Sequence, residues 1–156
     1  MVLVKKRLHK AEPGVAAIRN QLRKRTYWQS QNAFEQDFFL ESIAISESLI
    51  CDSLESFLHK VDGSAYVMTL EKAANKVLRK CYKDIDVVLI QDIKRWSSER
   101  DFAIHEIAKV HSSNQMDWDE RMLINEEIAR EGLELVTKAK NFAKRKYSPP
   151  TAKVIS

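Results

Sequence analysis

The sequence has little glycine and proline, three residues of each among 156. Folds built from many short strands need both residues at their turns, so this scarcity favours a helical protein. The length suits a single domain. With 44% hydrophobic and 31% charged residues, the chain can bury a core and still present a polar surface.

Cysteine and long apolar runs are also scarce. The two cysteines, Cys51 and Cys81, form no CxxC pair and have no histidine at zinc-ligand spacing, so we expect reduced thiols, no metal and no cofactor. No run of about 18 apolar residues occurs, and the start MVLVKKRLHKAEP lacks the apolar stretch of a signal peptide. We therefore expect a cytoplasmic protein without a membrane span.

Charge is distributed unevenly along the chain. Residues 1–28 carry a net charge of +7, residues 29–137 a net charge of −9 and residues 138–156 a net charge of +6, which together give the overall +4. An acidic body with two basic ends has two interpretations. The ends bind a polyanion, or they fold over the acidic body of the same chain or of a partner chain.

Apolar residues recur at helical spacing in most of the chain. We expect a break at residues 26–31 and helices over residues 13–25, 31–61, 69–85, 86–96 and 117–146. This pattern predicts an all-α protein, an up-and-down bundle of four to five helices. The predicted organisation is a basic N-terminal extension with a short helix (1–28), a helical bundle domain (29–146) and a disordered tail (147–156).

The predicted helix at 31–61 has two apolar sides. A broad stripe would face the core, and a narrower stripe contains Phe34, Phe38, Ile45 and Leu49. The narrower stripe needs a cover, either the N-terminal helix or another subunit. For the helix ends, we expect Gly63 as a left-handed C-cap, Thr69 as an N-cap and an acidic start at Asp117.

The stretch SSERDFAIHEIAK, residues 97–109, places Arg100 five positions before His105. Ser98 and Asp101 have capping-box spacing, so we expect a new helix, or a kink, near Ser98. Arg100 would then lie in a first turn, beside unpaired N–H groups that attract anions. Five helical residues separate the two side chains by about 140°. They would converge only if the first turn is distorted or a second subunit contributes its own pair.

Arginine and histidine together suit the cleavage of a ribose–phosphate link. Histidine titrates near neutral pH and can take a proton from a 2′-hydroxyl or give one to a leaving oxygen. Arginine holds a phosphate in a fork and offsets the charge that develops in the transition state. The product of such a reaction is a 2′,3′-cyclic phosphate.

The longer stretch DVVLIQDIKRWSSERDFAIHEI resembles the signature of the HEPN superfamily, an Arg followed by a polar residue and then a His, written Rx4–6H. The match falls on Arg100, Asp101 and His105, and Leu89, Ile93 and Trp96 resemble the apolar helix that leads to it. The resemblance implies a HEPN-like bundle and a homodimeric, metal-independent endoribonuclease, a toxin or antiviral defence effector that acts on RNA. It implies that Arg100 and His105 are catalytic, that Asp101 orients or lines the cleft, and that an antitoxin or other regulatory protein is a possible partner.

A second basic element precedes the predicted bundle. Arg23, Lys24 and Arg25 are followed by Tyr27 and Trp28, and such a combination of charge and stacking surface is typical of single-strand binders. We therefore consider the three basic residues candidates for substrate binding. The same aromatic residues would equally serve to pack the N-terminal helix on the bundle. The alternative function is a non-catalytic helical dimer that acts as a protein or nucleic-acid interaction module.

Overall fold

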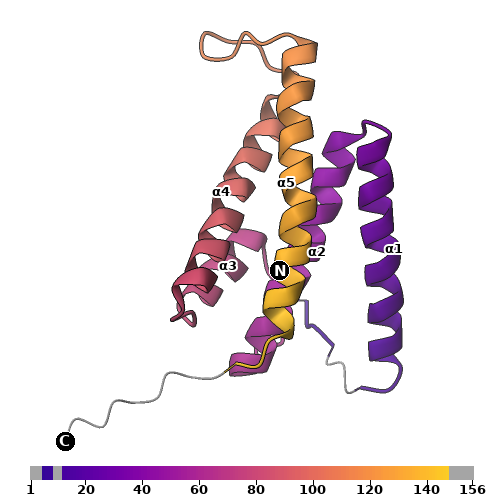
Figure 1. The fold of residues 1–156 in the computed structure, drawn as a ribbon, viewed down its shortest axis with the longest axis vertical. Coiled ribbons are helices and arrows are strands. Elements are labelled where there is room, and N and C mark those ends of the chain that lie inside the picture. The colour runs from indigo at the N-terminus through magenta and orange to yellow at the C-terminus, as the bar shows by residue number, and fades with distance from the viewer. Residues whose placement is uncertain (1–4, 9–11, 148–156) are drawn as a thin grey trace, which may run out of the picture.

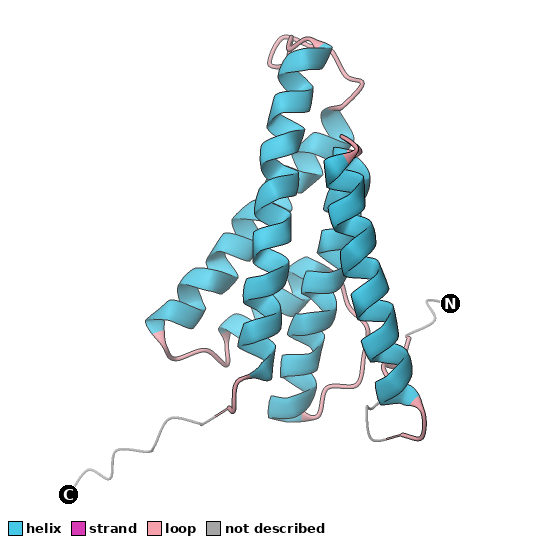
Figure 2. Cartoon of the chain, turned by 45° about the vertical axis from the view of Figure 1, so that its right-hand side comes forward, coloured by secondary structure: helices cyan, strands magenta, loops and turns pink. Residues whose placement is uncertain are grey.

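The computed structural model describes residues 5–8 and 12–147 of the chain. Within these residues the fold is all-α, with helices and loops and no strand (Figure 2). This confirms the predicted helical bundle. The predicted tail lies outside the described residues except for Tyr147. The helices are α1 (Val15–Glu35), α2 (Phe39–Asp62), α3 (Leu70–Leu78), α4 (Asp84–Glu106) and α5 (Trp118–Lys144).

Helix α5 occupies the middle of the bundle. Figure 1 shows α4 on one side of it and α1 on the other, with the short α3 beside the start of α4. Helix α2 packs along α5 and also contacts α1 and α3, while α4 packs on α5 and α3. The two central helices α2 and α5 therefore supply the surface on which the other three helices are positioned.

The boundary between the first two helices differs from the prediction. The expected break at residues 26–31 is wrong, because α1 continues through it to Glu35. The chain instead turns at residues 36–38, where Asp37 adopts a left-handed conformation with φ of 62°. Ser30 explains the difference. This polar residue is fully buried, and its hydroxyl lies 3.0 Å from that of Ser46 and donates to the carbonyl of Ser42.

Helix α1 covers the narrower apolar side of α2. Ser46 and Ser53 both contact α1 residues, and Leu49 lies between them on the same face and is 5% exposed. Phe34 closes the top of this interface by packing on Phe39, with ring centroids 5.6 Å apart. The cover thus comes from within the chain, whereas Phe38 in the turn remains 57% exposed.

Local signals set three further helix ends as predicted, but the helix expected over residues 69–85 is wrong at its end, because α3 stops at Leu78 and α4 begins at Asp84 after a short turn. Gly63 caps α2 with a φ of 71°, and the Thr69 hydroxyl accepts a hydrogen bond from the backbone N–H of Lys72 at the start of α3. Asp117 and Glu120 form a capping box at the start of α5. These ends depend on residues only two to four positions apart, which explains why the sequence indicates them well.

The centre of the core is organised around Trp96 of α4. Its side chain is fully buried, and its indole N–H donates to the carbonyl of Ile128 on α5 over 2.8 Å. Gly132, one turn further along α5, faces the same ring. A Cβ atom at Gly132 would lie 2.7 Å from Trp96 Cζ2 and 3.3 Å from Ser46 Cβ. The absence of a side chain at Gly132 therefore lets α5 approach both α2 and α4 closely.

The N-terminal basic residues fold onto α2. Asp52 forms ion pairs with Arg7 at 3.1 Å and Arg23 at 2.7 Å, and it also pairs with Arg19. Arg7 additionally donates to the carbonyl of Asp52 over 3.1 Å and to the hydroxyl of Ser56 over 2.5 Å. One carboxylate thus fastens the N-terminal segment and α1 to the acidic body of the same chain.

We predict that Asp52→Asn lowers the free energy of unfolding by about 1–2 kcal/mol, because three guanidinium groups lose their shared anion while partial exposure screens the effect. Urea denaturation measures the change. Glu134→Gln on the exposed side of α5 removes one carboxylate without an ion-pair partner among the described residues and serves as the matched control. Equal stability of the two variants would contradict the anchoring role of Asp52.

Candidate active site

The candidate site lies on the second half of α4. The expected helix start or kink at Ser98 is wrong, since α4 runs without interruption from Asp84 to Glu106. The Ser98 hydroxyl donates back to the carbonyl of Lys94 over 3.3 Å and does not cap a new helix. Trp96 and Ser97, just before it, are buried and hold this part of α4 against the core. Arg100 therefore lies inside a helix, away from any unpaired backbone N–H groups.

Two carboxylates hold the guanidinium of Arg100. Its Nη1 donates to Glu47 Oε2 of α2 over 2.6 Å, and its Nη2 lies 2.9 Å from Asp101 Oδ1 and 3.5 Å from the hydroxyl of Ser97. The Glu47 contact joins residues 53 positions apart in the chain. The guanidinium of Arg100 therefore has a fixed orientation, because Nη1 points toward α2 and Nη2 points toward the surface of α4.

The two carboxylates differ in exposure. The side chain of Glu47 is 26% exposed and that of Arg100 is 18% exposed, whereas that of Asp101 is 55% exposed. Burial raises the pKa of Glu47, and the positive charge of Arg100 partly offsets this rise. Arg100 Nε is buried and has no hydrogen-bond partner within the described residues. Glu47 is thus the inner anchor of the guanidinium, and Asp101 is its outer, more exposed partner.

His105 occupies the last turn of α4 and is exposed to solvent. Within the described part of the chain, no hydrogen bond or ion pair engages its ring. On a regular helix it lies about 140° from Arg100 and about 40° from Asp101, so Asp101 lies between the two. Because α4 is regular here, a single chain does not bring Arg100 and His105 together. Of the two routes to convergence considered above, only a second subunit remains.

Arg121 fixes the connection that follows His105, and nothing in the sequence pattern marked it. This arginine of α5 is 7% exposed and donates to the carbonyls of Glu106, Lys109 (2.7 Å) and Met116 (2.9 Å). It therefore binds the carbonyl of the last residue of α4 and two carbonyls of the loop that leads to α5. Glu106 accepts a hydrogen bond from the ring of His111 over 2.7 Å, which lowers the pKa of this glutamate and occupies it away from His105.

The N-terminal substrate-binding candidates lie elsewhere on the bundle. Arg23 is engaged by Asp52 and by the hydroxyl of Ser53, 2.8 Å away, while Lys24 and Arg25 are exposed. Asp52 and Glu47 are five residues apart on α2 and so point about 140° apart. The structure therefore places Arg23 and Arg100 on different faces of α2 and does not join them into one site.

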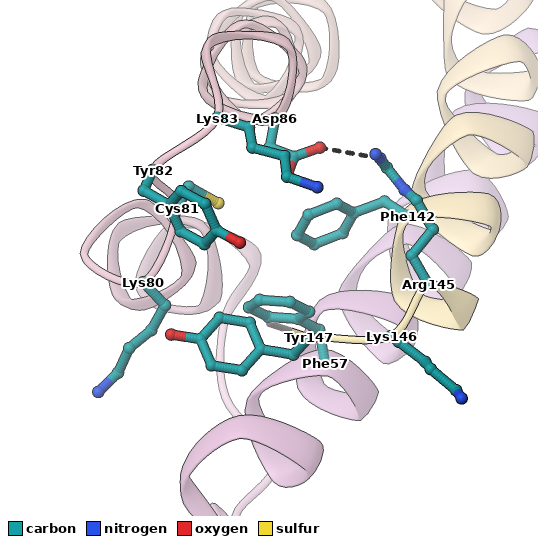
Figure 3. Close-up of a pocket in the computed structure, with 10 residues that line it drawn as sticks. All are labelled: Phe57, Lys80, Cys81, Tyr82, Lys83, Asp86, Phe142, Arg145, Lys146 and Tyr147. Carbon is teal, nitrogen blue, oxygen red and sulfur yellow. Dashed lines mark ion pairs between the residues drawn. The ribbon is translucent and has the colours of Figure 1, made fainter. Parts of the chain in front are cut away.

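A small pocket opens at the opposite end of α4. Its volume is about 40 Å³, and Figure 3 shows aromatic rings that include Phe57 and Phe142 along its wall. Arg145 pairs with Asp86 across it at 2.9 Å. Asp86 precedes Arg100 by 14 residues, or about 21 Å along the helix axis. The pocket is therefore separate from the candidate site.

Among the described residues, neither the cysteines nor any cluster of metal-ligating side chains forms a second reactive centre. Burial raises the pKa of Cys51 to about 12 and that of Cys81 to about 11, so both thiols stay protonated at neutral pH. Across residues 5–8 and 12–147, no group of three or more His, Cys, Asp or Glu side chains is arranged to hold a metal ion. No helix in this same part of the chain has an apolar stretch long enough to cross a membrane.

Comparison with known proteins produced no match: no family model fits the chain, and no curated protein or solved structure is significantly similar to it. The likeness to the HEPN superfamily therefore rests on the residues around Arg100 and His105 together with the helical architecture.

Proposed function

We propose that this chain is a metal-independent endoribonuclease of the HEPN type, a toxin or antiviral effector that acts as a homodimer. The observation that carries this proposal is that Arg100 is anchored from one side and His105 is exposed. Glu47 fixes the guanidinium from the core side, while the neighbouring Asp101 and His105 are exposed on α4. The proposal also includes RNA as the substrate, an antitoxin or other regulatory protein as a partner, and a cytoplasmic location.

The second subunit follows from the helix geometry. One chain directs Arg100 and His105 about 140° apart, so a shared cleft needs a two-fold partner that repeats both residues. Phe102 lies on the same outer side of α4 as His105 and is 46% exposed, which provides apolar surface next to the histidine. We place the dimer contact along this face of α4.

In the proposed reaction two protons are transferred, one bond to phosphorus forms and another bond to phosphorus breaks. One neutral His105 takes the proton of a ribose 2′-hydroxyl, and the 2′-oxygen attacks the adjacent phosphorus. The bond from phosphorus to the 5′-oxygen breaks, and the partner's His105, in its protonated form, donates a proton to that oxygen. The products are a 2′,3′-cyclic phosphate and a 5′-hydroxyl. Arg100 holds the non-bridging oxygens once the phosphate has displaced Asp101.

Mixing two inactive variants tests the composite site. Arg100→Lys and His105→Ala are each expected to lose cleavage of RNA in EDTA, whereas an equilibrated mixture regains part of it. About half of the mixed dimers are heterodimers that retain one arginine and one histidine in the shared cleft, so one of the two proton transfers keeps its histidine while water serves the other, and only part of the activity returns. Lysine is chosen because it keeps a positive charge beside the partly buried Glu47. A mixture as inactive as its components, at concentrations where light scattering shows dimers, would overturn the composite site.

A non-catalytic interaction module is the second candidate function. It is favoured by the two carboxylates on Arg100, which together already neutralise the guanidinium and would make it a purely structural ion pair. This alternative predicts full function in His105→Ala, because this side chain is exposed and forms no hydrogen bond or ion pair within the described residues. Removing residues 1–28 does not test it cleanly, because α1 extends from Val15 to Glu35 and packs on α2.

A further inference from the structure

The fold divides the basic residues into those with anionic partners and those without. Three N-terminal arginines are paired with Asp52, and Arg145 is paired with Asp86. By contrast, Lys24 of α1 and both Lys140 and Lys144 of α5 are exposed. Among the described residues, no carboxylate lies within ion-pair distance of these three lysines. Their charge is therefore available to a ligand.

The unpaired lysines lie side by side although more than 110 residues separate them in the chain. Helices α1 and α5 run antiparallel (Figure 1), and Arg130 of α5 lies 5.6 Å from the ring centroid of Phe34 on α1. Lys24 lies ten residues before Phe34, and Lys140 lies ten residues after Arg130. Because the two helices run antiparallel, Lys24 and Lys140 lie at the same level along the helix axes.

The direction of the pKa shift of Lys140 agrees with this placement. The pKa of Lys140 is lowered, mainly by the positive charge of Lys144 and by partial burial, and further by Arg23 and Lys24. No acidic residue contributes to the shift. Like charges gathered without compensation repel one another in the free protein, and a bound polyanion would relieve that repulsion.

An exposed aromatic ring extends the same surface. Trp28 follows Lys24 by one helical turn, on the same face of α1, and is 63% exposed. Such a large apolar side chain is costly to leave in water. Bases of a single strand stack on rings of this kind while neighbouring lysines contact the phosphates.

We propose that Lys24, Trp28, Lys140 and Lys144 form a strip that binds single-stranded RNA outside the cleavage site. This inference rests on the proposed function and extends it, since it assigns substrate binding to α5 residues as well as to α1. The lysines contact successive phosphates, and Trp28 stacks with one base. Arg23, already held by Asp52, contributes long-range charge and no direct contact.

Binding of a fluorescein-labelled 12-nucleotide RNA with 2′-O-methyl riboses tests the strip, because this strand cannot be cleaved through its 2′-oxygen. Fluorescence anisotropy is measured between 0.05 and 0.3 M salt. For Lys140→Gln/Lys144→Gln we expect about tenfold weaker binding and a slope of log K against log salt smaller by about 1.4. For Trp28→Ala we expect about 5- to 100-fold weaker binding with an unchanged slope.

The matched control is Lys72→Gln/Lys76→Gln, which removes the same two charges from α3. If this control weakens binding as much as the α5 pair does, net charge alone is responsible and the strip is wrong. Absence of binding by the unaltered protein would also overturn it.

Cleavage of a dinucleotide, which is too short to span the strip, separates this inference from the proposed function. Strip variants that cleave the dinucleotide normally but bind the 12-nucleotide strand weakly support both proposals. If the unaltered protein fails to cleave but the strip variants still lose binding, the nuclease proposal fails and the strip stands.

Discussion

Replacing His105 by alanine is expected to lower the rate of RNA cleavage by about 10²–10⁴-fold, which is the usual contribution of a general acid or base. The protein should fold as before, because the ring is exposed and forms no hydrogen bond or ion pair within the described residues. The rate is measured in EDTA under single-turnover conditions with a short RNA. Thermal denaturation on the same samples verifies that the variant is folded.

The matched control for His105 is His111→Ala. His111 lies six residues later in the chain, is also exposed, and bonds Glu106 over 2.7 Å. Its loss should leave the cleavage rate within a few-fold of that of the unaltered protein. A His105→Ala variant that cleaves RNA at the full rate, or a control variant that loses as much activity, would refute the catalytic assignment of His105.

The largest effect on stability is expected for Trp96→Ala. Removing this fully buried ring should lower the free energy of unfolding by about 3–5 kcal/mol, through lost apolar burial and the cavity that remains. Chemical denaturation followed by circular dichroism measures the loss. Val88→Ala, an exposed apolar position on the same helix, is the matched control and should change stability by less than about 0.5 kcal/mol.

A double-mutant cycle with Gly132 isolates the packing at Trp96. Gly132→Ala alone should destabilise the fold by about 1–3 kcal/mol, because the added Cβ would lie 2.7 Å from the ring. In a Trp96→Ala background the same change should be neutral or stabilising by up to about 1 kcal/mol, as expected from helix propensity. Additive effects of the two changes would contradict the close approach of α5 to this ring.

The errors in the helix boundaries at residues 26–31 and at Ser98 have one cause. Polar residues at 26–31 predicted a loop, yet Ser30 is buried because Ser42 and Ser46 of α2 satisfy its hydroxyl. Ser98 similarly matched a cap but donates to Lys94 within a continuous helix. In both places the polarity of a side chain was visible in the sequence, whereas the partner that satisfied it was not.

The candidate site was predictable only in part. Arg100, Asp101 and His105 stand close together in the chain, so their pattern was visible. Glu47 lies 53 residues from Arg100, and no spacing rule connects them. Likewise, no spacing rule connects Lys24 with Lys140, because they belong to the two basic ends of the chain, whose positions in the fold the sequence did not show. Only packing on α2 and α5 showed which basic residues are paired and which are not.

By itself, the sequence determined the all-α class, the caps at Gly63 and Thr69, the helix start at Asp117 and the unequal distribution of charge, because these depend on residues within a few positions of one another. The tertiary structure alone decided that α1 covers α2, that Glu47 anchors Arg100, and that α1 and α5 place unpaired lysines side by side. These contacts join distant segments, and their free energy comes from close packing and from burial of charge, which depend on three-dimensional neighbours.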